Sequence, residues 1–118
     1  MSQTVIPQLR ITEVEPSEHF YIDGLGFALD WEHRFEPGFP LFMQLTREGQ
    51  MIFLSQHSGD CEPGGAVYFI VQDAQRCLAE IKAKGIQPAN DIGDTPWGTR
   101  EFLLIDPDGN RLHFATHR

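Results

Sequence analysis

The predicted order of strands and helices repeats once along the chain, and this repetition is the strongest constraint on the fold. Alternating apolar residues and turn residues predict a strand, a helix and three strands at residues 4–11, 16–26, 28–35, 39–47 and 51–57. The same order is predicted again at residues 66–71, 74–84, 86–91, 99–105 and 110–116. Asp73 caps the second helix and Gly85 ends it. The sequence therefore predicts an α+β fold built from two similar modules.

The two modules match most clearly at the ends of their helices. An offset of 59 residues, half of the 118 in the chain, places Leu25-Gly26 on Lys84-Gly85 and Ile22 on Ile81. Few other residues agree, so the duplication rests on the pattern of elements. A chain of this length is too short for two domains that each bury a core. We therefore expect one domain over residues 1–118, with module one at about residues 1–58, module two at about 66–118, and a Gly/Pro-rich linker between them.

Composition and charge exclude several classes of protein. The apolar fraction of 41% indicates a globular chain rather than a disordered one. Nine basic and 17 acidic residues give a net charge of −8, which argues against nucleic acid as a partner. The acidic surface either keeps the protein soluble or attracts a cationic ligand. The longest apolar run, residues 66–71, is far shorter than the roughly 20 residues that span a bilayer, so we expect a cytoplasmic protein without a membrane partner.

The sequence contains no recognisable catalytic motif. The five histidines are scattered without an HExxH pattern, and Cys61 and Cys77 stand in no metal-binding or nucleophile arrangement. No Gly-x-Ser-x-Gly turn and no phosphate-binding glycine loop is present. Histidines on separate strands could still meet in the fold, so spacing alone leaves a metal site open. From the residues we assign no catalytic residue, no metal ligand and no cofactor.

Aromatic and polar side chains on the predicted strands are the candidates for contacting a ligand. Alternation places Met51, Phe53, Ser55 and His57 on one face of their strand. This mixture of apolar and polar groups suits a ligand-binding wall, although a core with a wet rim would show the same pattern. The predicted ligand-binding residues are Trp31, Phe35, Phe53, Ser55, His57, Tyr68, Trp97, Arg100, Phe102 and His113.

Two of these candidates stand close together in one segment. Trp97 lies between Pro96 and Gly98, which predicts a loop, and a large exposed aromatic on a loop favours contact with a ligand or a partner chain. Arg100 precedes Glu101, and the two side chains have two interpretations: Arg100 contacts the ligand, or the pair is solvated on the strand surface.

Three motifs give the chain a resemblance to a known family. Residues 20–27 read Phe-Tyr-Ile-Asp-Gly-Leu-Gly-Phe, residues 94–102 read Asp-Thr-Pro-Trp-Gly-Thr-Arg-Glu-Phe, and residues 106–114 read Asp-Pro-Asp-Gly-Asn-Arg-Leu-His-Phe. With these motifs the whole chain resembles the vicinal oxygen chelate superfamily, and within it the bleomycin resistance proteins and their glyoxalase-like relatives. The resemblance implies two βαβββ modules whose curved mixed sheets form a cup, normally completed in a two-fold dimer with ligand sites between modules.

The resemblance also implies where a metal would bind. Metal-using relatives carry ligands on the first and last strand of each module, at positions that correspond here to Ile6, Phe53, Ala66 and His113. Three of these four cannot bind a metal, whereas a catalytic site usually supplies three or more protein ligands. A shift of the alignment by one or two residues would bring in His57 or Gln8 instead. The expectation is therefore a protein without a metal site.

What remains by resemblance is a binding protein rather than an enzyme. We expect a homodimer that sequesters a cationic glycopeptide antibiotic, or a similar small molecule, without chemical change. The net charge of −8 would attract such a ligand, and Trp31, Phe35 and Trp97 would stack on its flat rings. The alternative is a metal-dependent glyoxalase-like lyase or dioxygenase that uses His113 with His57 or Glu101. A third possibility, a structural or regulatory interaction module, applies only if no pocket forms between the sheets.

Overall fold

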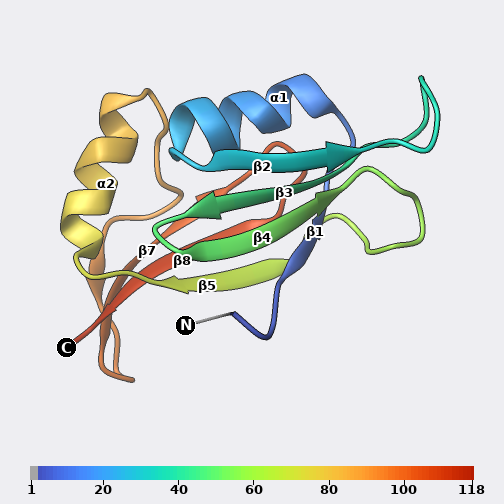
Figure 1. Ribbon diagram of the computed structural model, residues 1–118. Coiled ribbons are helices and arrows are strands. Elements are labelled where there is room, and N and C mark those ends of the chain that lie inside the picture. The colour runs from blue at the N-terminus through green and yellow to red at the C-terminus, as the bar shows by residue number, and fades with distance from the viewer. Residues whose placement is uncertain (1–2) are drawn as a thin grey trace.

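The computed structural model describes residues 3–118, so the first two residues of module one lie outside it. Figure 1 shows the predicted element order twice, from blue to green and from yellow-green to red. The first half holds β1 (Gln8–Arg10), α1 (Val14–Glu18), a π-helical turn η1 (His19–Gly24), β2 (Ala28–His33), β3 (Phe42–Arg47) and β4 (Gln50–Ser55). The second half holds β5 (Ala66–Ile70), α2 (Ala74–Ala83), β6 (Gly93–Asp94), β7 (Thr99–Ile105) and β8 (Arg111–His117).

The strands form two four-stranded mixed sheets with the same topology. Their orders are β1-β4-β3-β2 and β5-β8-β7-β6, so in each sheet the first strand pairs in parallel with the last. The paired residues are 45 apart in both sheets: Gln8 pairs with Phe53 (53 − 8) and Tyr68 with His113 (113 − 68). The predicted fold class, α+β with two mixed sheets of the βαβββ type, is confirmed.

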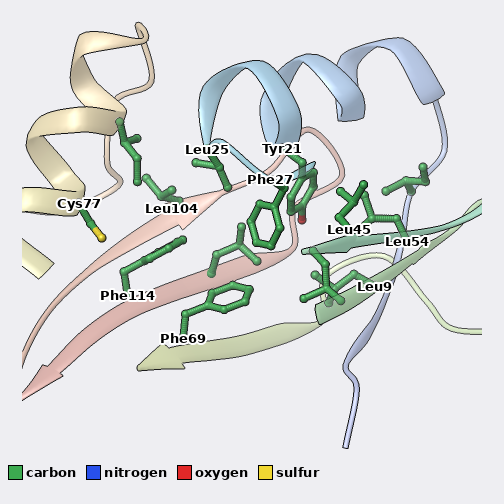
Figure 2. Close-up of a cluster of buried hydrophobic side chains, with 14 of the residues drawn as sticks. Leu9, Tyr21, Leu25, Phe27, Leu45, Leu54, Phe69, Cys77, Leu104 and Phe114 are labelled. Carbon is green, nitrogen blue, oxygen red and sulfur yellow. The ribbon is translucent and has the colours of Figure 1, made fainter. Parts of the chain in front are cut away.

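The two modules share one hydrophobic core. The ring of Phe27, just after η1, packs edge-on against Tyr21 and against Phe69 of β5, with ring centroids 6.0 and 5.8 Å apart. Phe69 in turn packs on Phe114 of β8. In Figure 2, Cys77 of α2 points toward the same cluster, so side chains of both halves meet there. The core therefore joins the modules rather than filling each one separately.

A buried polar network also joins the modules. The Tyr21 hydroxyl donates a hydrogen bond to Oδ2 of Asp106 (2.7 Å), and the Asn110 amide donates to the same oxygen (2.8 Å). The Asn110 side chain also donates to the backbone carbonyl at the end of β1 and accepts from the N–H groups of Gly64 and Gly65. The turn between β7 and β8 thus holds the linker and the first strand in place.

One predicted strand is wrong. Residues 86–91 form no strand, and the short β6 begins only after them. The Ala89 N–H donates to the carbonyl of Leu103, but the Leu103 N–H is taken by the side-chain oxygen of Asn90 rather than by a backbone carbonyl. Because a side chain replaces the backbone partner, a ladder cannot propagate there.

The first helix also differs from its prediction. It begins at Val14 and ends at Gly24, two residues earlier at each end than the predicted 16–26, and its second part is π-helical. The Leu25 N–H bonds to the carbonyl of Phe20, five residues back, which widens the turn. No helix among residues 3–118 is long and apolar enough to cross a membrane.

Candidate ligand-binding site

The second sheet turns alternate side chains away from the core, and we call the surface that they form its open face. Two predicted ligand residues, Tyr68 and His113, lie on this face together with Glu101. Tyr68 of β5 and His113 of β8 are directly paired, and Glu101 follows the same alternation on β7. The intervening residues Phe69 and Phe114 point into the core. The rings of Tyr68 and His113 stack in parallel, with centroids 4.2 Å apart. Strand alternation therefore gathers these side chains on one surface.

Glu101 is the centre of this group, which we call the Glu101 cluster: Tyr68, Trp97, Thr99, Glu101 and His113. Its Oε1 accepts hydrogen bonds from the Thr99 hydroxyl (2.6 Å) and from the indole N–H of Trp97 (3.3 Å). Its Oε2 accepts from the Tyr68 hydroxyl (2.8 Å) and lies 3.3 Å from Nδ1 of His113. The Glu101 residue is only 9% exposed. A nearly buried carboxylate thus fixes the positions of two aromatic side chains.

These contacts decide the charge of the cluster. Burial raises the pKa of the Glu101 carboxyl group, but the hydrogen bonds from Thr99, Tyr68 and Trp97, together with nearby His113, outweigh burial and hold that pKa below its ordinary value. The hydrogen bond to Glu101 raises the pKa of Tyr68, because an ionised phenolate would face the carboxylate. At neutral pH the cluster therefore contains a carboxylate and a neutral phenol.

Trp97 lies on a tight loop before β7, as predicted. The loop is closed by the Thr95 N–H, which donates to the carbonyl of Thr99 (2.8 Å), and by Gly98, which adopts a φ of 91°. A positive φ of this size favours glycine. Trp97 remains 66% exposed although its N–H is bound to Glu101. The indole is therefore held in place with much of its surface open to a ligand.

A second aromatic group lies on the open face of the first sheet, and we call it the Trp31 cluster: Trp31, Phe42 and Phe53. The ring of Trp31 lies 5.8 Å from that of Phe42 and 5.9 Å from that of Phe53, centroid to centroid. A bulge between Leu29 and Trp31 shifts the register of β2 against β3. The bulged residue, Asp30, accepts hydrogen bonds from two β3 side chains, so its carboxylate lies beside this cluster.

The remaining predicted residues of the first module lie at the end of β4 and in the loop after β2. Phe35 is 74% exposed and packs edge-on against His33 and His57, with centroids 5.0 and 6.4 Å apart. Ser55 is fully buried; its hydroxyl donates to Asp60 and accepts from the backbone N–H of His57. Ser55 therefore supports the loop that follows β4 instead of offering its hydroxyl to a ligand.

Arg100 and Phe102, both predicted as ligand-binding residues, do not lie on the open face that carries Glu101. Both alternate with Glu101 on β7 and so lie on the opposite face of the sheet. Phe102 is fully buried and stacks on Phe114 in the core. The Arg100 guanidinium donates to Asp94 (3.1 Å) and to Gln75 of α2 (3.0 Å). The proposed solvated pair with the adjacent Glu101 is not formed either, because the two side chains point to opposite faces.

The residues at the expected metal positions do not fit a metal ion. Phe53 offers no donor atom, nor do Ile6 and Ala66. His113 has one acidic neighbour, Glu101, but among residues 3–118 no group of three or more His, Cys, Asp or Glu side chains is arranged to hold an ion. Structural and catalytic metal sites use three or four protein ligands. We therefore derive no reaction step through a metal.

A cleft of about 470 Å³ lies away from both clusters, where the end of η1, the β3–β4 turn and α2 meet. None of the ten predicted ligand residues lines it. Its walls carry the acidic residues Asp23, Glu48 and Glu80 and the basic residues Arg47 and Lys84. The predicted ligand residues that belong to the two clusters therefore lie on the open faces of the sheets, and not in this cleft.

Sequence reasoning missed two residues of the clusters and gave a third a different role. Thr99 and Phe42 were not in the predicted ligand-binding set, and Glu101 was considered only as an ion-pair partner of Arg100 or as a metal ligand. The signal was present in the alternation along residues 99–105. It places Thr99 and Glu101 on one face of β7 and Arg100 on the other.

Comparisons with known proteins agree with this architecture. The chain belongs to the glyoxalase superfamily, whose family model matches residues 1–118. Among curated relatives, a bleomycin resistance protein of Geobacillus stearothermophilus is 30% identical over 125 aligned positions, which cover 92% of each chain. Bleomycin resistance proteins of Staphylococcus aureus match to the same extent.

Two solved structures share the fold over nearly the full chain. A bleomycin-binding protein complexed with bleomycin superposes with a TM-score of 0.79 at 24% identity, covering 99% of this chain and 100% of the other. A bleomycin resistance determinant encoded on the transposon Tn5 superposes with a TM-score of 0.80 at 23% identity, covering 99% of both chains. The predicted relationship to the glyoxalase and bleomycin resistance proteins is confirmed.

Proposed function

We propose that this protein binds a cationic glycopeptide antibiotic of the bleomycin type, or a similar small molecule, on the open faces of its sheets and holds it without chemical change. The observation that carries this proposal is the Glu101 cluster, where an ionised carboxylate holds an exposed indole on the sheet face opposite Phe69 and Phe114 of the core. The similarity to bleomycin resistance proteins supports the same ligand class. Among the described residues, the side chains around His113 do not form a group of three or more metal-binding side chains.

Exposed aromatic rings supply the contact surface for the ligand's flat groups. Trp97 is 66% exposed and Trp31 is 43% exposed, yet both are held by neighbours, so little side-chain entropy is lost on binding. Each ring stack adds about 0.5–1.5 kcal/mol beyond the area that it buries. Phe35, on the loop after β2, offers a third ring.

The net charge of −8 favours encounter with a cation. A negative potential raises the association rate of a positively charged ligand and falls with ionic strength. Asp30 and Glu101 bring part of this charge to the two open faces. Association should therefore slow as salt is added, whereas stacking on the aromatic rings should change little.

We further propose that the working form is a homodimer in which a second copy covers part of these faces. Large apolar side chains remain exposed on the open face of the second sheet: Ile70 alternates with Tyr68 on β5, and Ile105 with Glu101 on β7. Contiguous exposed apolar surface is typical of interaction sites. Light scattering of the purified protein at micromolar concentration tests this arrangement: a mass of twice 13.4 kDa is expected, and a monomer would contradict it.

Calorimetric titration with metal-free bleomycin, in the presence of a chelator, tests the function. Saturable binding is expected, with bleomycin recovered unchanged in mass after release. Trp97→Ala should weaken binding about tenfold, because it removes the held ring. Arg76→Ala, on the exposed side of α2, serves as the control and should bind like the wild type. No heat of binding at high micromolar bleomycin would overturn the proposal.

A further inference from the structure

The Glu101 carboxylate lacks a permanently charged partner. Among residues 3–118, no lysine or arginine nitrogen lies within 4.0 Å of it, and His113 is the one ionisable cation that does. Its hydrogen-bond donors Tyr68, Trp97 and Thr99 are neutral groups. A carboxylate that is only 9% exposed normally requires a cation nearby, because desolvation is costly. Among the described residues, His113 is therefore the one side chain whose protonation would balance this charge, and with a neutral His113 the cluster carries a net negative charge.

Contact with Glu101 also decides which nitrogen of His113 carries the proton. Nδ1 lies 3.3 Å from Oε2 of the carboxylate, and a lone pair in that position would repel the negative charge. The neutral ring therefore carries its proton on Nδ1 and a lone pair on Nε2. Within the described residues, Nε2 receives no hydrogen bond, and the side chain is 21% exposed. Stacking against Tyr68 fixes the plane of the ring.

With a neutral His113, the site combines a hydrogen-bond acceptor, a net negative charge and flat aromatic surfaces on one open face. A hydroxyl group of a ligand could satisfy the acceptor but not the charge. An ammonium group satisfies both, because it donates a hydrogen bond and carries a positive charge. A carboxylate or phosphate would be repelled.

We propose that the Glu101 cluster selects a protonated amine of the ligand, whose N–H donates to Nε2 of His113 while Glu101 balances its charge. This inference rests on the proposed function, since it names the ligand group that the site selects. Glu101 is a positioning residue here: it sets the protonated nitrogen of His113 and the placement of Trp97, and it supplies the charge.

A matched pair of small ligands tests the selection. Tryptamine and tryptophol share an indole ring and a two-carbon chain, but only tryptamine ends in an ammonium group. NMR titration of the wild type should show at least about tenfold tighter binding of tryptamine, the range of a charged hydrogen bond. Equal binding of the two, or binding of neither, would overturn the proposal.

Two variants separate Glu101 from the general negative charge. Glu101→Gln keeps the shape and removes the charge, and it should reduce the preference for tryptamine to within about twofold. Glu80→Gln removes the same charge from the exposed surface of α2 and should keep the wild-type preference. If both variants behave alike, the preference comes from the net charge and the proposal is wrong.

The position of the proton on the His113 ring is a second readout. It is measured in the free wild-type protein and so does not depend on whether a variant folds. Nitrogen NMR of the imidazole at neutral pH should show a single proton, on Nδ1; a ring protonated mainly on Nε2, or on both nitrogens, would overturn the proposal. In Glu101→Gln, the preference for Nδ1 should weaken, because the amide can present either a donor or an acceptor to the ring.

Bleomycin separates this inference from the proposed function. If tryptamine is preferred through Glu101 but metal-free bleomycin does not bind, the amine selection stands and the bleomycin-type function fails. If bleomycin binds and Glu101→Gln leaves its affinity unchanged, the function stands and the amine selection at this cluster fails.

Discussion

The two tyrosines of the chain make the same kind of hydrogen bond in different surroundings, and this permits a matched test of the buried network. The Tyr21 hydroxyl donates to Asp106 at 2.7 Å, and the Tyr68 hydroxyl donates to Glu101 at 2.8 Å. Tyr21 is fully buried, whereas Tyr68 is 47% exposed. Replacing each by phenylalanine removes one hydroxyl and leaves the ring.

The expected losses differ because water can replace only one of the two bonds. In Tyr21→Phe, an oxygen of the Asp106 carboxylate loses one hydrogen-bond donor, and burial keeps water from replacing it. A hydrogen bond to a charged group is worth about 1.5–3 kcal/mol. Asp106 keeps its bonds from Asn110, so we expect a loss of about 2 kcal/mol. In Tyr68→Phe, solvent reaches the site, and we expect a loss of about 0.5 kcal/mol.

Urea denaturation measures both losses, and alkaline pH adds a second signature. Burial raises the pKa of Tyr21 well above its ordinary value, and the charge of Asp106 raises it further. The unfolded tyrosine ionises near pH 10, so the unfolded state loses its proton first. The free energy of unfolding of the wild type should therefore fall as the pH rises above about 10, and Tyr21→Phe should show a smaller fall.

Equal losses in the two variants at pH 7 would refute this expectation, because the burial of Tyr21, rather than the hydrogen bond itself, should cause the difference between them. An alkaline dependence in Tyr21→Phe as steep as in the wild type would refute the part assigned to ionisation. A loss of about 2 kcal/mol would lower the melting temperature by roughly 8 °C in a domain of this size, well within the resolution of a thermal scan.

Four further outcomes are expected from denaturation experiments. Asn110→Ala should cost about 3 kcal/mol or prevent folding, because it removes the bonds that hold the linker and the end of β1. Gly24→Ala should destabilise the protein by about 1–3 kcal/mol, because a Cβ there would meet the side chain of Ile86, and Ile86→Ala in the same chain should relieve that clash. Asp73→Ala should cost about 1 kcal/mol as a lost helix cap; an unchanged midpoint would contradict this. Because the pKa of Glu101 is lowered in the folded state, Glu101 should stabilise the wild type at pH values above about 4.3, the pKa of an unfolded glutamate. This contribution should be lost as the pH falls below that value, and Glu101→Gln should lack this pH dependence.

The parts of the fold that local chemistry determines were predictable from sequence. Strand β7 was predicted at its observed bounds, and α2 begins after its Asp73 cap as expected. The strand expected at residues 86–91 failed because a side-chain oxygen, that of Asn90, competes for a backbone donor, and this competition depends on a partner strand that the local pattern does not show. The π-helical turn at the end of the first helix likewise depends on how it packs against the core.

The residue types of the candidate site were predictable from the sequence, but the strand face that each residue occupies was not. Trp97 and His113 were predicted because exposed aromatics and strand histidines are recognisable, and the structure gathers both around Glu101. Arg100 was chosen for its charge, but alternation along β7 sends it to the helix side. Which face of a strand is open follows from the neighbouring strands and helices, so Glu101 became central only in the assembled sheet.

The placement of Asn110 has a consequence for the order in which the chain can fold during synthesis. The contact between its side chain and the carbonyl of Arg10 joins residues 100 positions apart, and Tyr21 awaits Asp106, 85 positions later. Asp106 and Asn110 are both synthesised after the whole of the first module. The amino-terminal half therefore has no means of completing its own polar network while it is being made. Although the order of elements occurs twice, the two halves therefore differ during synthesis: the polar network of the earlier half is completed only by residues of the later half.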